Sequence, residues 1–333
     1  MLKGFRMRQN DVSLLIGATG FIGRSLGNYL RVQGEKIVGT YVHSPVKGMF
    51  SSDICLVRCD VTKKKNLEKI LKQFNPRYIY YLAAQSSIRH AWLKPIETIQ
   101  VNFLGGVYLL EAIRRFKLNT KVLIFSSGTS YGTSYESGKP LTEKACLKPK
   151  DPYSVSKMSI DFFGRFYAKV YGMDISVVRL ANFTGPSQST VFSIPNFASQ
   201  IAKIEAGLQL PKIEVGNLSA HRDYLDIRDG VRAFYLAMKK AKNGEAYNIA
   251  SGRSRTLHEV LDALLDVSHL KKSEVKVVKT STLIPKDEIS DIKLSASKFM
   301  KLTGWRPRFS FFETARDILN DWRIQVRKFS RKR

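Results

Sequence analysis

The chain of 333 residues is 44% hydrophobic and 11% aromatic, so it can bury a large core and is expected to be globular. Its three cysteines, Cys55, Cys59 and Cys146, are too scattered for a disulfide framework, and no cysteine and histidine cluster has metal-site spacing, which excludes a disulfide-rich secreted domain and indicates the reducing cytoplasm. The net charge of +27 would attract phosphates, acidic lipid surfaces or nucleic acid, but no nucleic-acid recognition motif accompanies it.

The N-terminal residues 1–10 contain three basic side chains and are expected to form a flexible extension. The mostly apolar run that follows them is shorter than a signal-peptide core and leads directly into glycines. No stretch approaches the roughly 20 apolar residues that span a bilayer. We therefore expect a soluble protein without an export signal.

Apolar runs alternate with amphipathic segments from residue 12 onward. The run 12–16 is apolar except for Ser13 and is bounded by glycine, as in a parallel strand buried on both faces. The alternation predicts an α/β fold with a doubly wound parallel sheet, a Rossmann-type dinucleotide-binding domain over residues 11–185. Further strands are expected at 36–41, 54–59, 78–82, 121–125 and 175–179, and helices directly after the first strand and at 66–74, 98–116 and 153–171.

The alternation weakens after residue 185, where loop-forming glycines and prolines accumulate. We interpret residues 186–323 as a smaller C-terminal α/β lobe for substrate, with helices expected at 224–238 and 257–265. A segment of this lobe could return to the Rossmann core. Residues 324–333 are rich in arginine and lysine and are expected to form a solvated basic tail.

A G-x-x-G-x-x-G turn separates the first strand from the first helix. Glycine lets the chain turn tightly and lets its backbone N–H groups approach a pyrophosphate at the positive end of a helix. Because strand, turn and helix occur in the required order, the motif predicts a dinucleotide site. The residues of the turn that we expect to bind the cofactor are Gly17, Thr19, Gly20, Phe21, Ile22 and Gly23.

The end of the second strand favours NADP over NAD, with NAD as the alternative cofactor. An NAD site usually has an acidic residue there that binds the ribose hydroxyls. This chain has His43 instead, so no carboxylate repels a 2′-phosphate, and Arg24 or Lys47 could reach it. Asp60, followed by Val61, comes directly after the third strand, and its carboxylate would either accept a hydrogen bond from the adenine or cap the next helix.

Tyr153 and Lys157 form a Y-x-x-x-K pair, which a helix places on one face. A lysine ammonium lowers the pKa of a nearby phenol, so Tyr153 could exchange a proton with a sugar hydroxyl or ketone near neutral pH. The pair is common by itself and often lies on a surface. Here a strand ends at Ser127, which could hold the same substrate oxygen or form a plain turn, and Tyr131 is expected to shape the pocket.

With these motifs in order, the chain resembles the extended short-chain dehydrogenase/reductase superfamily of nucleotide-sugar epimerases, dehydratases and reductases, over residues 12–323. Several segments look closer still to the GDP-4-dehydro-6-deoxy-D-mannose reductases and their GDP-mannose 4,6-dehydratase relatives. These segments are residues 83–87 with Trp92 and Pro95, and residues 182–186, 197–202, 216–218, 222–224 and 304–307.

The resemblance implies a role for each matching residue. Ser127, Tyr153 and Lys157 would carry the chemistry, and the last two would also contact the cofactor. Arg222 would grip the diphosphate of the sugar nucleotide, as suits a permanently charged, bidentate fork. The further residues implied are Leu82, Ala83 and Ala84 for the cofactor, and Ser86, Ser87, Ser127, Asn182 and Asn217 for the substrate.

Two departures bear on the activity. The dehydratases carry an acidic residue just after the catalytic Ser/Thr, and the close reductases tend to have a glutamate near it, whereas this chain has Gly128 and Thr129. Dehydratase activity is therefore not expected, and the small-residue pattern is also similar to that of the 4-epimerases. Relatives usually have an arginine where this chain has Ile284, which Lys286 or Arg253 could replace.

We therefore expect an NAD(P)H-dependent 4-keto reductase that acts on a GDP-linked 4-keto-6-deoxyhexose. A nucleotide-sugar 4-epimerase and a catalytically silent dinucleotide-binding scaffold are the alternatives. The resemblance also implies a homodimer that pairs through the helices at 98–116 and 153–171. Weak contact with an anionic membrane surface would be one use of the positive charge.

Overall fold

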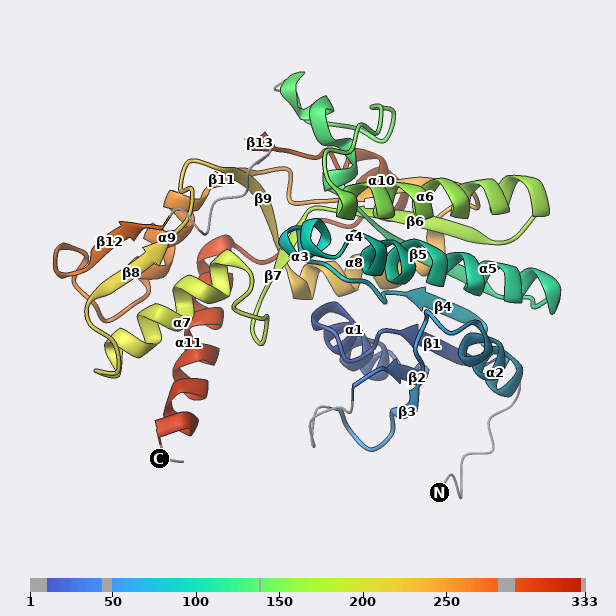
Figure 1. The fold of residues 1–333 in the computed structure, drawn as a ribbon, viewed down its shortest axis with the longest axis horizontal. Coiled ribbons are helices and arrows are strands. Elements are labelled where there is room, and N and C mark those ends of the chain that lie inside the picture. Colours follow the sequence, from blue (N-terminus) through green and yellow to red (C-terminus); the bar gives the residue numbers. More distant parts are fainter. Residues whose placement is uncertain (1–10, 44–49, 138, 281–290, 331–333) are drawn as a thin grey trace.

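The computed structural model describes residues 11–43, 50–137, 139–280 and 291–330. Its main sheet has seven parallel strands in the order β10-β6-β5-β4-β1-β2-β3 (Figure 1). The chain runs outward from β1 in one direction, returns to β4, and then runs outward in the other. This topology confirms the predicted doubly wound Rossmann-type sheet. The strands are β1 (Val12–Ile16), β2 (Lys36–Tyr41), β3 (Cys55–Arg58), β4 (Tyr78–Tyr81), β5 (Lys121–Ser127), β6 (Ile175–Leu180) and β10 (Ala246–Ile249).

Helices cover both faces of this sheet (Figure 1). Helices α1 (Phe21–Val32) and α8 (Ile227–Lys240) pack on one face, and α2 (Lys64–Phe74), α5 (Gly105–Arg115) and α6 (Pro152–Tyr171) pack on the other. Alternate residues of each strand enter the two cores, because successive side chains of a strand point to opposite faces. Strand β1 is buried along its whole length, Ser13 included, whose hydroxyl donates to Glu35 Oε2 at 2.8 Å.

The helix expected at 98–116 has an irregular first half. Helix α4 (Pro95–Ile99) continues into a π-helical turn, η1 (Gln100–Leu104), before α5 begins. A short helix, α3 (Ile88–Leu93), precedes them. The π turn places Asn102 in the protein interior, fully buried. Such turns change the direction of the side chains on a helix, which hydrophobic periodicity does not reveal.

The helix expected at 224–238 begins later than predicted. Residues 221–226 form strand β9 (His221–Asp226), and α8 begins at Ile227, because the Asp226 carboxylate accepts a hydrogen bond from the Arg228 N–H at 2.8 Å and caps the helix. Helix α8 and β10 then lie in the Rossmann core, so residues 227–249 form a returning segment.

The second lobe contains a third core and two small sheets. One sheet has the order β11-β9-β13 with β7 also paired to β9, and the other pairs β12 with β8. Helix α11 extends to residue 330 and buries Val326, so residues 324–330 are helical rather than a solvated tail. The elements are β7 (Asn182–Thr184), α7 (Ser193–Glu205), β8 (Lys212–Val215), β11 (Ser254–Thr256), α9 (Leu257–Asp266), η3 (Lys272–Glu274), β12 (Lys276–Lys279), β13 (Asp291–Ile292), α10 (Ser297–Thr303) and α11 (Phe311–Ser330).

Several expectations concern residues outside the described ranges: the N-terminal extension 1–10, Lys47, the segment with Ile284 and Lys286, and the last residues 331–333. Of the helices within these ranges, none combines the length and hydropathy needed to traverse a bilayer.

Candidate active site

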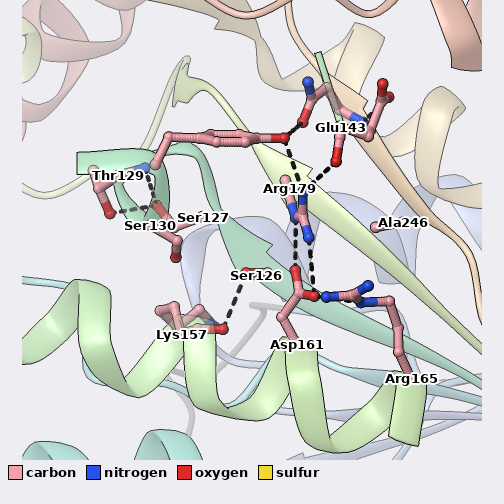
Figure 2. A network of polar contacts seen from close by, with 12 residues as sticks. Ser126, Ser127, Thr129, Ser130, Glu143, Lys157, Asp161, Arg165, Arg179 and Ala246 are labelled. Carbon is pink, nitrogen blue, oxygen red and sulfur yellow. Dashed lines mark hydrogen bonds and ion pairs between the residues drawn. The ribbon is translucent and has the colours of Figure 1, made fainter. Parts of the chain in front are cut away.

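Ser127, Tyr153 and Lys157 come from two adjacent elements. Ser127 is the last residue of β5, and Tyr153 and Lys157 lie in the first two turns of α6. Helix α6 begins there because the Asp151 carboxylate accepts hydrogen bonds from the backbone N–H and the hydroxyl of Ser154, at 2.9 and 2.6 Å. The Ser126 hydroxyl donates to the Lys157 carbonyl at 3.0 Å and joins the strand end to the helix (Figure 2).

The phenol of Tyr153 is held in its protonated form. Burial raises its pKa to about 12, so the expected lowering of the phenol pKa by Lys157 is wrong for this structure. The Ser127 hydroxyl lies 2.9 Å from Thr129 Oγ1 and accepts a hydrogen bond from the Thr129 N–H at 3.2 Å. The strand end therefore presents a fixed hydroxyl beside a phenol that can donate a proton at neutral pH.

Lys157 is only 5% exposed, and burial lowers its pKa to about 8. Its ammonium makes no hydrogen bond or ion pair with the other described residues. A buried cation without a partner is costly, and hydroxyl groups of a bound ligand would relieve that cost. The environment of Lys157 therefore fits the ribose of a dinucleotide.

Glycine occupies the three positions of the turn for different structural reasons. Gly17 has a φ of 94°, and a Cβ there would lie 2.8 Å from the Ala83 backbone nitrogen. A Cβ on Gly23 would overlap with the Gly17 carbonyl oxygen. Gly20 has a φ of −70°, and its nearest neighbour would be 3.5 Å away. Packing thus requires the first and third glycines, whereas the second leaves the start of α1 open to a pyrophosphate, which fits a dinucleotide.

Further predicted cofactor residues lie around this turn. The Gly17 N–H donates to Thr40 Oγ1 at 2.9 Å, which ties the turn to β2. Thr19, Phe21, Ile22, Leu82, Ala83 and Ala84 are partly buried, and Ala83 packs directly on Gly17. His43 is exposed just after β2.

The Asp60 carboxylate, just after β3, stabilises a turn and does not cap helix α2. Asp60 Oδ1 accepts hydrogen bonds from the N–H and the hydroxyl of Thr62, at 2.9 and 2.7 Å, and Lys63 rather than Asp60 is the N-cap of α2. The capping alternative for Asp60 is therefore wrong, since its carboxylate orders the turn before the helix. Val61 is buried and packs against Gly105.

Asn182 lies close to the end of β5 that carries Ser127. Ser127 pairs with Leu180 in the main sheet, and Asn182 follows two residues later at the start of β7. Its side-chain nitrogen is buried and has no hydrogen-bond partner. A buried amide donor without a partner suits a ligand that offers an oxygen atom.

Of the other predicted substrate residues, Ser87 and Asn217 contact residues close to them in sequence, whereas Arg222 lies on a strand that pairs with a distant segment. Ser87 caps α3 by accepting a hydrogen bond from the His90 N–H at 3.2 Å, and Ser86 beside it is exposed. Asn217 Oδ1 accepts two hydrogen bonds from Ser219 and orders a turn. Arg222 lies on β9, which pairs with β7. The small sheet thus places Arg222 and Asn182 on neighbouring strands.

Asn102 is a residue of the site that sequence reasoning missed. Its amide exchanges two hydrogen bonds with the backbone of Gln85, at 2.7 and 2.9 Å, and donates a third to the Ser156 hydroxyl at 2.9 Å. Ser156 in turn donates to the Tyr153 carbonyl at 2.6 Å. Asn102 therefore ties the loop after β4 to helix α6. The one sequence signal is a polar residue within an apolar helix.

Tyr131 does not shape the pocket as expected. It is fully buried, its hydroxyl donates to Asn248 Oδ1 at 2.8 Å, and it accepts a hydrogen bond from Arg179 Nη1 at 3.0 Å. Its burial follows from the 3-10 segment η2 (Gly128–Ser137), which turns this side chain into the core.

Across the described ranges, no group of three or more His, Cys, Asp and Glu side chains is arranged to hold a metal ion.

Comparisons with known proteins agree with this geometry. The GDP-6-deoxy-D-mannose reductase of Pseudomonas aeruginosa is 28% identical over 312 residues, which cover 94% of this chain and 97% of that protein. A solved structure of RMD from Pseudomonas aeruginosa complexed with NADPH matches with a TM-score of 0.81 and 28% identity, over 94% of this chain and 99% of that one. The Thermus thermophilus UDP-glucose 4-epimerase in complex with NAD matches with a TM-score of 0.84 and 25% identity, over 94% and 99%.

A family model described as GDP-mannose 4,6 dehydratase matches residues 14–318, which include the glycine turn, the catalytic strand end, helix α6 and most of the second lobe. The resemblance inferred from the motifs is thereby confirmed. Because the match covers nearly the whole chain, this protein belongs to the GDP-mannose 4,6 dehydratase family.

Proposed function

We propose that this protein is a 4-keto reductase that uses NADPH, with NADH as the alternative, to reduce a GDP-linked 4-keto-6-deoxyhexose. The observation that carries the proposal is the placement of Ser127 at the carboxyl end of β5, which the Ser126 hydroxyl joins to the first turns of α6 that carry Tyr153 and Lys157. Reduction of a ketone needs a proton donor, and the phenol of Tyr153 carries the proton that the developing alkoxide oxygen takes up. The similarity to a GDP-6-deoxy-D-mannose reductase supports the choice of substrate.

The residues of the chain would divide the work as follows. The dinucleotide, when bound, supplies the hydride. Ser127 donates a hydrogen bond to the ketone oxygen, and Tyr153 transfers its proton to that oxygen as the C–O double bond becomes a hydroxyl. Lys157, one helical turn away, holds the nicotinamide ribose, and its ammonium stabilises the phenolate that remains. Solvent then returns a proton to Tyr153.

The other site residues would bind the two ligands. We propose that the glycine turn with His43, Asp60 and the residues after β4 holds the dinucleotide, and that Arg222 and Asn182 hold the diphosphate and the sugar. Gly128 and Thr129 follow the catalytic serine and offer no carboxylate. Elimination of water across the sugar needs an additional acid and base, so the reductase is favoured over the dehydratase.

The test mixes purified protein with NADPH and the GDP-4-keto-6-deoxyhexose and follows the loss of reduced cofactor. Tyr153→Phe should remain folded, bind NADPH normally and lose about a hundredfold to ten-thousandfold in kcat, because it removes the proton donor and little else. Full activity in that variant would contradict the proton-donor role. Absence of turnover with several nucleotide 4-keto sugars would contradict the reductase.

A nucleotide-sugar 4-epimerase is the second candidate, favoured by the small residues after Ser127 and by the similarity to a UDP-glucose 4-epimerase. An epimerase regenerates its cofactor, so it would form product without added NADPH. A silent dinucleotide-binding scaffold would bind NADPH and convert no substrate. The same assay therefore separates all three functions.

We also propose a homodimer that pairs through α5 and α6. Helix α6 exposes an apolar row in which Phe162 and Phe166 are each 51% exposed and Val170 is 54% exposed. Exposed apolar patches of this kind mark protein interfaces. Light scattering of the purified protein would test whether its mass in solution is that of a dimer.

We propose a reducing, cytoplasmic location, which the three free cysteines support. Binding of the protein to acidic vesicles would test whether the positive charge serves weak contact with an anionic membrane surface.

A further inference from the structure

Four buried polar residues form a connected cluster between α6 and β10, which we call the hub: Asp161, Arg179, Tyr131 and Asn248. Each is at most 2% exposed. Figure 2 shows Asp161 pointing from α6 toward Arg179, with Arg165 on the other side of the carboxylate. The hub is not in contact with the predicted cofactor residues of the glycine turn, and the chemistry proposed above makes no use of it.

On one side, the hub holds the catalytic helix. Arg179 Nε and Nη2 donate to the two oxygens of Asp161 at 2.7 and 3.2 Å, and Arg165 Nε donates a third hydrogen bond at 2.8 Å. Asp161 lies one helical turn beyond Lys157 on α6, and Arg179 lies on β6. A buried ion pair contributes little net stability compared with apolar packing, because both charges must be desolvated. Its fixed, bidentate geometry does define how α6 sits on the sheet.

On the other side, the hub reaches the substrate lobe. The Asn248 amide donates to the carbonyl oxygens of Leu141 and Ser295, at 3.0 and 3.2 Å. Leu141 and Leu294 form an isolated parallel bridge, which aligns these two segments. Ser295 lies three residues after β13, and β13 pairs with β9 at His221 and Arg222. The hub is therefore connected through a short backbone segment to the strand that carries Arg222.

Tyr131 is the joint between the two sides. Its hydroxyl is the only hydrogen-bonding atom of its side chain, and it accepts from Arg179 while it donates to Asn248. Arg179 also donates to the Glu143 carbonyl at 3.3 Å, and the Glu143 carboxylate accepts from the Asn248 N–H at 2.8 Å, which gives a parallel but longer link. Loss of the Tyr131 hydroxyl would leave the aromatic ring packed in the core but would break the shorter connection between Arg179 and Asn248.

We propose that the hub fixes the position of strand β9, which carries Arg222, relative to helix α6, which carries Tyr153 and Lys157. The Tyr131 hydroxyl connects the two halves of the hub. Tyr131 and Asn248 are positioning residues, since they touch neither ligand site. The kinetic part of this inference rests on the proposed reductase activity, whereas its structural part does not.

The experiment compares Tyr131→Phe with Tyr247→Phe. Tyr247 is a matched control because it is also buried, lies next to Asn248 on β10, and has a hydroxyl that makes one hydrogen bond, with the Lys242 N–H at 3.2 Å. Tyr131→Phe should raise the KM for the nucleotide sugar about fivefold, because it removes the two hydrogen bonds that link Arg179 to Asn248, with kcat changed less and NADPH affinity unchanged. Amide hydrogen exchange in residues 221–226 and 291–295 should become faster.

If Tyr131→Phe matches Tyr247→Phe in both KM and exchange, the hub does not position the lobe. Asn248→Ala provides a second variant, and it should accelerate exchange in residues 291–295 at least as much as Tyr131→Phe, because it also removes the bond to Ser295. Failure of the proposed function would appear differently, as absence of turnover in the unmodified protein, and the exchange comparison would still decide the structural claim.

Discussion

The two ends of the site are built on different principles. At the dinucleotide end, the backbone itself restricts the residues: Gly17 has a positive φ, and Gly23 has no room for a Cβ. At the proposed substrate end, Asn182 and Arg222 occupy ordinary strand positions, and their strand neighbours come from distant parts of the chain. Local geometry therefore constrains the first end, and the packing of the lobes constrains the second.

Within the glycine turn, packing requires Gly23 but leaves space at Gly20, so substitutions at these two glycines should have opposite outcomes. Gly23→Ala should lower the free energy of unfolding by about 4 kcal/mol or more, because the new Cβ would overlap with the Gly17 carbonyl and lie 2.7 Å from the Ala18 oxygen. Gly20→Ala should keep its melting temperature and weaken NADPH binding about tenfold, because only the ligand needs that space. Thermal unfolding and NADPH titration measure the two effects. Unaltered NADPH affinity in Gly20→Ala would show that the turn is not the phosphate site.

The buried ammonium of Lys157 makes the same region sensitive to pH. Its folded pKa of about 8 lies below the ordinary value of 10.5, so the unfolded chain binds the proton more tightly between these values. The free energy of unfolding should therefore rise by about 3 kcal/mol as the pH increases from 8 to 10.5. Lys157→Met should remove this rise. Urea unfolding without cofactor at several pH values checks it, and parallel pH profiles for both proteins would contradict it.

Asn102 and Asn182 allow a comparison between a side-chain amide that stabilises the fold and one that we propose binds a ligand. Asn102→Leu should cost about 2 kcal/mol in stability, because it leaves the backbone groups of Gln85 without partners. Asn182→Leu should leave stability unchanged within about 0.5 kcal/mol, because its side-chain nitrogen already has no partner, and should raise the KM for the sugar nucleotide about tenfold. Equal losses of stability in the two variants would remove the argument that Asn182 awaits a ligand.

The fold was predictable wherever one face of an element is apolar or a turn needs a special residue. Strand β1 and helix α9 occupy nearly the predicted ranges for this reason. Strand β9 was mistaken for the start of a helix, because the Asp226 cap that ends it lies inside an apolar periodic segment. Tyr131 and Asn102 were misjudged or missed, since a buried polar residue has no periodic signal and depends on partners that are remote in sequence.

The sequence alone determined the Rossmann-type sheet, the glycine turn and the placement of Tyr153 and Lys157 one turn apart on a helix, because these depend on hydrophobic alternation, on glycine backbone geometry and on helical spacing. Only the tertiary structure decided that Tyr131 joins Arg179 to Asn248 and that residues 324–330 continue a helix, which buries Val326 against the second lobe. Each of these depends on which groups meet in space, and the energy of a buried hydrogen bond is set by its partner rather than by its own residue type.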